Sequence, residues 1–405
     1  MNRTAVYRRE PSNLGGRVAM AVAALTLGAL LCACSHSSSP SGDAATTAIA
    51  PIPTPMATSI ETADGTWSSI PMGHLDQPLN TFWQLFFLPS GSSTWSNQVE
   101  ATAVATNGGI VLASDGHSLL AGIRPSNLLT YSPLIDTSDA GNTWSNGLLT
   151  EALTAHPNAL AVNANGQGLA LVNGPGSIRV LSSDNLSTWR TLVSEPTLAA
   201  SIPGRDCGLA SIDALAYSSG EPVVGAQCSR PGVVGIFADD PGGWRLVGPL
   251  LPSSRRGAGV EVLSLDATDT GLSALLGVSD PSGTSLVGAT TANGGVNWAL
   301  SPAFRLKASE QVASFGPAPD AGFFVLSSGP SGDNLEVLDG PNSTWAALPP
   351  PPTGTATVAF GPAPTVDALV VDQTVMTVWT LSTGSSSGWV KGQVVNVPIQ
   401  FGSSS

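Results

Sequence analysis

Seven tryptophans recur at nearly regular intervals along the chain. They are 44 to 55 residues apart and stand at Trp95, Trp144, Trp189, Trp244, Trp298, Trp345 and Trp389. A repeat period of roughly 20 to 50 residues is typical of proteins built from one supersecondary unit copied along the chain. The spacing therefore predicts seven copies of one small structural unit.

The composition indicates that these units consist of β-strands. The 405-residue sequence is 42% hydrophobic and 11% charged, with 45 Gly and 32 Pro, which is too apolar for a disordered protein and too turn-rich for a helical one. Short runs of Val, Leu, Ala and Thr are bounded by Gly, Pro, Asn and Asp. Since the period matches one four-stranded propeller blade, we expect an all-β, seven-bladed β-propeller of antiparallel blades over residues 63–401, with a flexible tail at 402–405.

The segment before Trp144 carries the most complete copy of a second repeated feature. It reads Thr137-x-Asp139-x-Gly141-x-Thr143-Trp144. Related endings place an Asp or Asn five residues before the tryptophan, as in Asp184 with Trp189, Asp239 with Trp244, and Asn293 with Trp298. The motif resembles the Asp-box of BNR-repeat propellers, which include sialidases, xyloglucanase-type glycosidases and photosystem II assembly propellers. The resemblance implies a hairpin between the third and fourth strands of each blade.

Turn chemistry explains this motif without a ligand. An Asp side chain can accept hydrogen bonds from the amides of its own turn, and Gly can adopt a positive φ angle. The tryptophan would then begin the outermost strand and pack against the neighbouring sheet. Asp139 is expected to be structural rather than a calcium ligand or a catalytic acid, because one carboxylate cannot fill the six to eight oxygen positions that calcium prefers.

The N-terminus has the pattern of an export signal. Arg3, Arg8, Arg9 and Arg17 precede an apolar stretch at 18–31, and Leu31-Cys32-Ala33-Cys34 follows. This order resembles a bacterial lipobox, which implies cleavage after residue 33, a lipid on Cys34 and attachment to the outer side of the cell membrane. An ordinary signal peptide and a short transmembrane anchor are the alternatives. Residues 34–62 are predicted to be a flexible tether rich in Ser, Ala, Thr and Pro.

Export would change the charge and the cysteine count. Removal of four arginines and one glutamate with residues 1–33 would move the formal charge from −13 to −16, which argues against nucleic acid as a partner. Two unlipidated cysteines would remain, Cys207 and Cys228, and an oxidising compartment favours a disulfide between them. No His or further Cys nearby completes a zinc site, and no metal or cofactor motif is found. A monomer is expected.

Cations gather in connections that the predicted topology places on one face, opposite the Asp-boxes. They are Arg205, Arg230, Arg255, Arg256, Arg305 and Lys307. A cation-rich face on an acidic protein could bind an anionic glycan or an acidic protein segment. The alternative is that these residues are simply solvated loop side chains.

Polar residues also align just before the apolar part of each predicted first strand. Taking Val104, Val162, Tyr217, Leu265, Phe315 and Phe360 as equivalent, the residues four positions earlier are Glu100, Asn158, Asp213, Glu261, Gln311 and Ala356. First strands line the channel of a propeller, so Glu100, Asp213 and Glu261 could orient a ligand or a cation there. A merely hydrated channel mouth is the other interpretation.

An enzyme is the less favoured function. The resemblance to sialidases would require three arginines, a Tyr–Glu nucleophile pair and an acid–base Asp. Only Tyr131 and Tyr217 follow the leader, and "GIRPS" at Arg124 is the nearest match to the arginine motif. A glycoside hydrolase using two carboxylates, with Asp213 and Glu261 as weak catalytic candidates, stays open. We therefore expect a lipid-anchored binding or scaffolding module for a glycan or protein partner.

Overall fold

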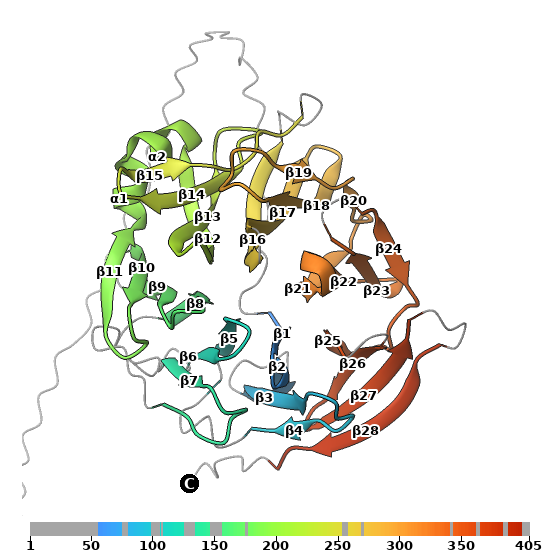
Figure 1. The fold of residues 1–405 in the computed structure, drawn as a ribbon. Helices are drawn as coiled ribbons and strands as arrows, with labels where there is room; N and C mark the ends of the chain where they lie inside the picture. Colours follow the sequence, from blue (N-terminus) through green and yellow to red (C-terminus); the bar gives the residue numbers. More distant parts are fainter. Residues whose placement is uncertain are drawn as a thin grey trace, which may run out of the picture. The chain divides into compact units, whose positions relative to one another are not determined.

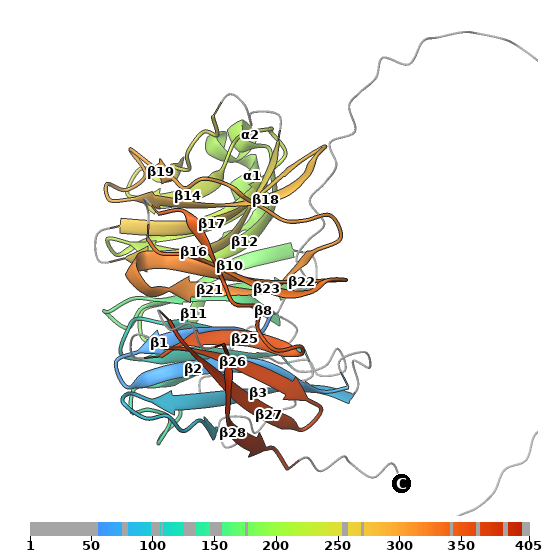
Figure 2. The same cartoon turned by 90° about the vertical axis from the view of Figure 1, so that its right-hand side faces the viewer.

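The computed structural model describes residues 56–74, 80–98, 106, 108–124, 134–145, 156–174, 177–252, 258–268, 271–340, 343–361, 365–383 and 388–398. The predicted leader, Cys34, most of the tether and the 402–405 tail lie outside these ranges. Antiparallel sheets follow one another around a common centre (Figures 1 and 2), so the predicted all-β propeller architecture is confirmed. None of the helices within the described ranges is long and apolar enough to cross a membrane.

The strands group into sheets in sequence order. The first sheet has β1 (Thr58–Thr62), β2 (Gly65–Gly73), β3 (Thr81–Pro89) and β4 (Ser96–Asn97), and the second has β5 (Gly109–Ser114), β6 (Leu119–Arg124) and β7 (Leu134–Thr137). The third has β8 (His156–Val162), β9 (Gly168–Gly174), β10 (Ser177–Ser183) and β11 (Trp189–Ser194). Two short helices follow it, α1 (Glu195–Ala200) and α2 (Ile202–Cys207).

A nine-stranded sheet follows the helices. It combines β12 (Leu209–Ser218), β13 (Glu221–Cys228), β14 (Gly235–Asp240) and β15 (Gly243–Leu246) with β16 (Gly259–Thr268), β17 (Gly271–Asp280), β18 (Gly283–Thr291), β19 (Ala299–Leu300) and β20 (Phe304–Arg305). A single residue pair, Cys228 with Val260, joins these two sets of strands. The nine-stranded sheet is therefore two consecutive repeat units that touch at one edge.

Two four-stranded sheets complete the ring. They are β21 (Gln311–Ala318), β22 (Gly322–Gly329), β23 (Gly332–Leu338) and β24 (Trp345–Leu348), then β25 (Thr355–Phe360), β26 (Thr365–Asp372), β27 (Val375–Ser382) and β28 (Val390–Asn396). A 3-10 turn at Pro319–Ala321 connects β21 to β22. In Figure 1 the first strand of each set lies nearest the centre.

The sequence-predicted boundaries hold best in the third sheet. The short apolar runs at 158–164, 168–172, 177–183 and 188–193 each predict a strand, and β8 to β11 match them in order, with a hairpin between β10 and β11. The predicted start of the propeller at residue 63 was wrong, because β1 lies within residues 34–62, which were expected to form the tether. Its sequence, TSIET, has one large apolar residue and pairs in register with β2, so the pairing rather than the composition makes it a strand.

The repeated tryptophans tie each sheet to the one before it, as expected. Indole Nε1 atoms donate hydrogen bonds of 2.8 to 3.1 Å to backbone carbonyls of the preceding repeat, from Trp298 to Val247, from Trp345 to Pro302 and from Trp389 to Pro349. Trp144 packs edge-on against Trp67 of the first sheet, with ring centroids 5.6 Å apart. The Trp189 indole instead donates to the Leu186 carbonyl of its own loop at 3.0 Å, so this bond is not made at every step from sheet to sheet.

The same residue type closes the ring. Trp95 donates its indole N–H to Asp367 Oδ2 in the last sheet at 3.0 Å, and both groups are buried. The Gln393 side chain accepts a hydrogen bond from the backbone amide of Trp95 at 2.7 Å and donates one to the backbone carbonyl of Trp95 at 2.8 Å. The first and last sheets lie side by side in both views (Figures 1 and 2). Side-chain hydrogen bonds, rather than a strand shared between the two ends, therefore join them.

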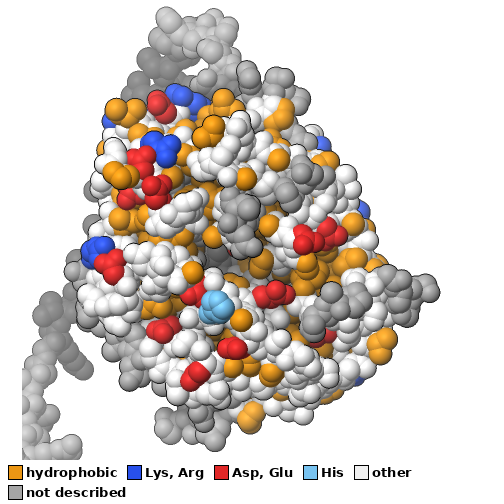
Figure 3. All heavy atoms as spheres, in the orientation of Figure 1, with side chains coloured by type: hydrophobic (Ala, Val, Ile, Leu, Met, Phe, Trp, Pro, Cys, Tyr) orange, Lys and Arg blue, Asp and Glu red, His pale blue; other side chains and the backbone are white. Residues whose placement is uncertain are grey.

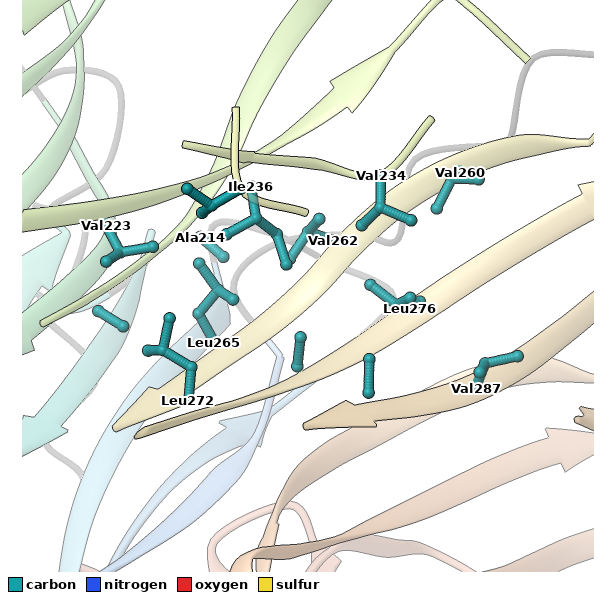
Figure 4. Close-up of a cluster of buried hydrophobic side chains, with 14 of the residues drawn as sticks. Ala214, Val223, Val234, Ile236, Val260, Val262, Leu265, Leu272, Leu276 and Val287 are labelled. Atoms are coloured by element: carbon teal, nitrogen blue, oxygen red, sulfur yellow. The ribbon is translucent and has the colours of Figure 1, made fainter. Parts of the chain in front are cut away.

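Aliphatic side chains fill the space between neighbouring sheets. Figure 4 shows the cluster between β12–β14 and β16–β18, where Ile236, Val262 and Leu276 are buried. Gly225 in β13 permits this close approach, since a Cβ at that position would lie 2.7 Å from Val262 and 3.0 Å from Ala214.

Asp139 closes its loop as the turn chemistry predicts. Its Oδ1 accepts hydrogen bonds of 2.9 Å from the Thr143 amide and from the Thr137 hydroxyl, and Gly141 has a φ of +82°. These bonds hold the pKa of Asp139 below its usual range, with the Thr143 side chain as the main cause. Asn293 does the same in its loop, accepting from the Thr291 hydroxyl at 3.0 Å and the Asn297 amide at 2.9 Å ahead of Trp298.

Two other loops differ from the expected motif. Before Trp189 the acceptor is Asn185, which bonds the Thr188 amide at 2.9 Å, whereas Asp184 forms an ion pair with Arg190 at 2.6 Å. The loop is one residue shorter than the Asp139 loop, so the acceptor is displaced by one position. Before Trp244, Asp239 pairs directly with the tryptophan across a two-residue turn, and no room for the motif exists.

Candidate functional site

The first strands enclose two connected cavities at the centre of the ring. Their volumes are about 260 and 180 Å³. Both are lined by residues of β1, β5, β8, β12, β16 and β21, and they share a wall that includes Leu160, Leu215 and Leu265. The predicted channel is therefore present, and its wall is mainly aliphatic.

Each of five first strands contains a β-bulge, and the positions of these bulges show which of the residues aligned in the sequence are structurally equivalent. The residues left out of the pairing are Asn158, Asp213, Leu263, Ala313 and Ala356, and β12 also leaves out Ala210 near its start. Asn158, Asp213 and Ala356 are thus equivalent as expected. Glu261 and Gln311 are not in this column, because the bulges in β16 and β21 fall two residues after them.

The remaining acid of that ring lies outside the described residues. Glu100 was expected to precede the first strand of the second sheet near Val104. The channel wall of that sheet is instead β5, which contributes Leu112 to both cavities. The alignment of Val104 with the other first strands was therefore wrong.

Asp213 and Glu261 still come close enough to influence one another. Burial raises the pKa of Asp213 to about 6, and the Ser211 hydroxyl donates to its Oδ2 at 2.9 Å. Burial and, secondarily, the charge of Asp213 raise the pKa of Glu261 to about 7. The Oε2 atom of Glu261 is buried without a hydrogen-bond partner. The two carboxyls therefore share one poorly hydrated region beside the smaller cavity.

Glu195 is a third member of this group that the sequence did not reveal. It is the first residue of α1, and the hydroxyl of Ser194 caps the helix by accepting from the Thr197 amide. Burial raises the pKa of Glu195, and its charge contributes to the raised pKa of Asp213. The signal available was Ser-Glu-Pro-Thr, a helix start that fixes an acid at its first position.

The structure pairs two of the predicted cations locally. Arg305 lies 3.9 Å from Asp280, and Lys307 lies 3.1 Å from Glu310. Arg205 of α2 is exposed and donates to the carbonyl of Ala200, the last residue of α1. Arg255 and Arg256 lie outside the described residues.

Arg205 and Arg230 belong to backbone segments that also carry, or pair with, two exposed apolar residues. Ile202 is 69% exposed and Leu250 is 71% exposed, although both are large aliphatic residues. Ile202 and Arg205 belong to α2, whose last residue, Cys207, accepts from the Arg230 amide at 3.1 Å. Leu250 pairs with Val233, whose amide donates to the Arg230 carbonyl. We call these four residues, Ile202, Arg205, Arg230 and Leu250, the α2 patch.

The predicted disulfide holds this patch in place. Cys207 and Cys228 are bonded, with their Cα atoms 5.1 Å apart, and both are buried. The bond fastens the end of α2 to the end of β13, two residues before Arg230. Arg205 and Arg230 are thus presented on a fixed backbone rather than on two independent loops.

Charge differs over the surface. Acidic side chains outnumber basic ones on the face shown in Figure 3, in keeping with the formal charge of −13.

The described residues contain no group of three or more His, Cys, Asp or Glu side chains placed to hold a metal ion. Tyr217 is buried in the first strand β12, and burial raises the pKa of its hydroxyl to about 12, which makes it a poor nucleophile.

The chain is similar to several solved structures. A putative 6-phosphogluconolactonase from Bacteroides uniformis matches at 14% identity with a TM-score of 0.52, over 82% of this chain and 97% of that one. YCF48 from Cyanidioschyzon merolae matches at 14% identity and a TM-score of 0.44, over 80% and 95% of the two chains. A six-bladed fucose-recognising lectin from Aleuria aurantia matches at 12% and 0.41, over 86% and 96%. No family model and no curated protein sequence matches. Similarity at this level concerns the propeller architecture alone.

Proposed function

We propose that this protein is a binding module that holds an acidic segment of a partner protein on its α2 patch. The observation that carries the proposal is that Ile202, Leu250, Arg205 and Arg230 are all exposed and lie on segments that backbone pairing holds together. Neither arginine forms an ion pair within the described part of the chain. Arginine beside aliphatic side chains is typical of protein-binding surfaces, where charge gives orientation and apolar area gives affinity.

The apolar members favour a protein segment over a glycan. Exposed large aliphatic residues gain little from the hydroxyl-rich surface of a sugar, whereas they bury apolar side chains of a peptide. The rest of the molecule is acidic and would repel an acidic partner elsewhere, so the partner would be directed to this patch.

The test uses a synthetic peptide of alternating Glu and Leu and measures its affinity for the protein. Reversing both patch arginines, as Arg205→Glu with Arg230→Glu, should weaken binding at least tenfold, about 1.4 kcal/mol or more, and flatten its dependence on salt. The matched control, Arg190→Glu, changes an exposed arginine paired with Asp184 and should have little effect. Equal losses in both variants, or binding of acidic glycans with no binding of the peptide, would contradict the proposal.

Glycoside hydrolysis is a second candidate because burial raises the pKa values of Asp213 and Glu261, and the charge of Asp213 raises that of Glu261 further. A retaining enzyme would need the two carboxyls roughly 5 Å apart and an inverting one roughly 6.5 to 9.5 Å apart. An assay with a panel of aryl glycosides tests this directly. Activity that Glu261→Gln abolishes would establish an enzyme, whereas no hydrolysis above background would leave the binding function.

The proposal includes a seven-bladed ring and a lipid anchor on the outer side of the cell membrane. Support for the blade number comes from the seven tryptophans and from the consecutive strand sets described above. Support for the anchor comes from Leu31-Cys32-Ala33-Cys34 after an apolar stretch. Labelling with an azido fatty acid should mark the protein but not Cys34→Ser. Labelling of that variant would exclude the lipid site.

A further inference from the structure

An aliphatic ring surrounds the middle of the central channel. One apolar residue from each of six first strands lines both cavities, namely Ile60, Leu112, Leu160, Leu215, Leu265 and Pro317. The cavities, of about 260 and 180 Å³, are smaller than the roughly 300 to 1,000 Å³ typical of sites for drug-sized ligands. The channel therefore suits a compact ligand with an apolar body.

One carboxylate lies in the wall of both cavities. Asp266 of β16 lines the two spaces, and the Ser264 hydroxyl donates to its Oδ2 at 2.9 Å. The other charged residues of the described wall are Glu61, in the larger cavity, and Asp213, in the smaller one. No Lys, Arg or His is found among the described residues that line either space. The channel thus carries negative charge in an apolar setting with no positive side chain to offset it.

Packing does not explain why an Asp occupies this position. Asp266 lies three residues after the bulge of its strand, and the equivalent residues in the other bulged first strands are Ala161, Ala216, Gly316 and Ala359. Four of these five equivalent positions hold Ala or Gly, so the packing of the strands does not require a carboxylate there. An ionised carboxylate in such surroundings costs free energy unless a cation accompanies it.

We propose that the central channel binds a small organic ammonium ion, with the Asp266 carboxylate as its counter-charge and the aliphatic ring around its methyl or methylene groups. An organic cation fits better than a metal ion, because Mg²⁺ and Ca²⁺ need six or more oxygen ligands and the ring supplies carbon. Alkylammonium groups are weakly hydrated at their carbon atoms, so they can exchange water for aliphatic contacts while keeping one ion pair. This site is separate from the α2 patch and does not depend on the proposed function.

The test compares two probes of the same shape that differ in charge. Choline and its neutral isostere, 3,3-dimethylbutan-1-ol, are titrated into the purified protein, and binding is followed by calorimetry and by saturation-transfer NMR. Choline should bind about tenfold or more tightly than the alcohol, and Asp266→Ala should remove that difference. Since Ala is the residue at equivalent positions, this variant should keep the fold, which circular dichroism would verify.

A matched variant controls for the loss of one negative charge. Asp372→Asn removes an exposed carboxylate at the end of β26, outside both cavities, and should leave choline affinity within twofold of the unmodified protein. The Arg205→Glu, Arg230→Glu variant should also bind choline normally, so failure here is distinguishable from failure of the peptide proposal. The ammonium site would be refuted by equal affinity for the two probes, by no binding of choline, or by unchanged choline binding in Asp266→Ala.

Discussion

Replacing Asp266 with Ala should stabilise the protein, and more so at alkaline than at acidic pH. The residue lies in the channel wall, where burial raises its pKa from an ordinary value of 3.8 to about 6. A carboxyl whose pKa is raised by folding is harder to ionise in the folded protein than in the unfolded chain. The resulting penalty is fully present above about pH 6 and disappears as the pH falls below the unfolded value.

The size of the effect follows from the two pKa values. Full ionisation costs up to about 3 kcal/mol at pH 8, and about half of that applies at pH 5, where the folded carboxyl is largely protonated. The substitution also removes the hydrogen bond from Ser264, worth about 1 kcal/mol, at every pH. The stability of Asp266→Ala relative to the unmodified protein should therefore rise by about 1–2 kcal/mol between pH 5 and pH 8.

Urea denaturation at a series of pH values measures this difference. The free energy of unfolding is compared for the unmodified protein, Asp266→Ala and Asp372→Asn, whose carboxylate is exposed. We expect the pH dependence of the exposed variant to follow that of the unmodified protein. A stability difference for Asp266→Ala that is constant from pH 5 to pH 8, or that falls with pH, would refute the reasoning.

Two further predictions concern the bonds that fix the ring. Removing the disulfide through Cys207→Ala with Cys228→Ala should lower the free energy of unfolding by about 3 kcal/mol, because the bond closes a loop of about 20 residues in the unfolded chain; free thiols in unreduced protein, detected by mass spectrometry, would contradict this. Trp95→Phe and Asp367→Ala should each lower the free energy of unfolding by about 1–3 kcal/mol, because the indole N–H and the carboxylate are buried hydrogen-bond partners. A double-mutant cycle should show a coupling of about 1 kcal/mol or more between the two substitutions. Additive losses would show that this bond does not close the ring.

The architecture could be predicted because it follows from local rules repeated many times. The recurring strand and turn residues predict an all-β propeller, and the turn chemistry predicts the bonds that Asp139 and Asn293 accept in their loops, since both depend on contacts within a few residues. The third sheet was predicted strand by strand for the same reason. The hydrogen bond from Trp95 to Asp367 joins residues 272 positions apart, so no local sequence pattern predicts it.

The site was harder to predict because it depends on register. A β-bulge displaces every later residue of a strand by one position, so two bulges placed differently moved Glu261 out of the column that contains Asp213. The sequence does not single out Asp266, because it directly follows Leu265 in the strand and its importance depends on the alanines and glycine at equivalent positions. Glu195 was missed because its closeness to Asp213 arises from the path of α1, which sequence periodicity does not describe.

Hydrogen exchange with the Glu–Leu peptide bound and unbound tests the central claim, that the α2 patch is the binding surface. Backbone amides of residues 202–208 and 229–234 should exchange more slowly in the complex, because they carry or adjoin Arg205 and Arg230. The hairpin of residues 137–144, which holds no part of the patch, should exchange at the same rate in both states. Protection confined to that hairpin or to the other tryptophan-bearing loops, with none at 202–208, would contradict the account.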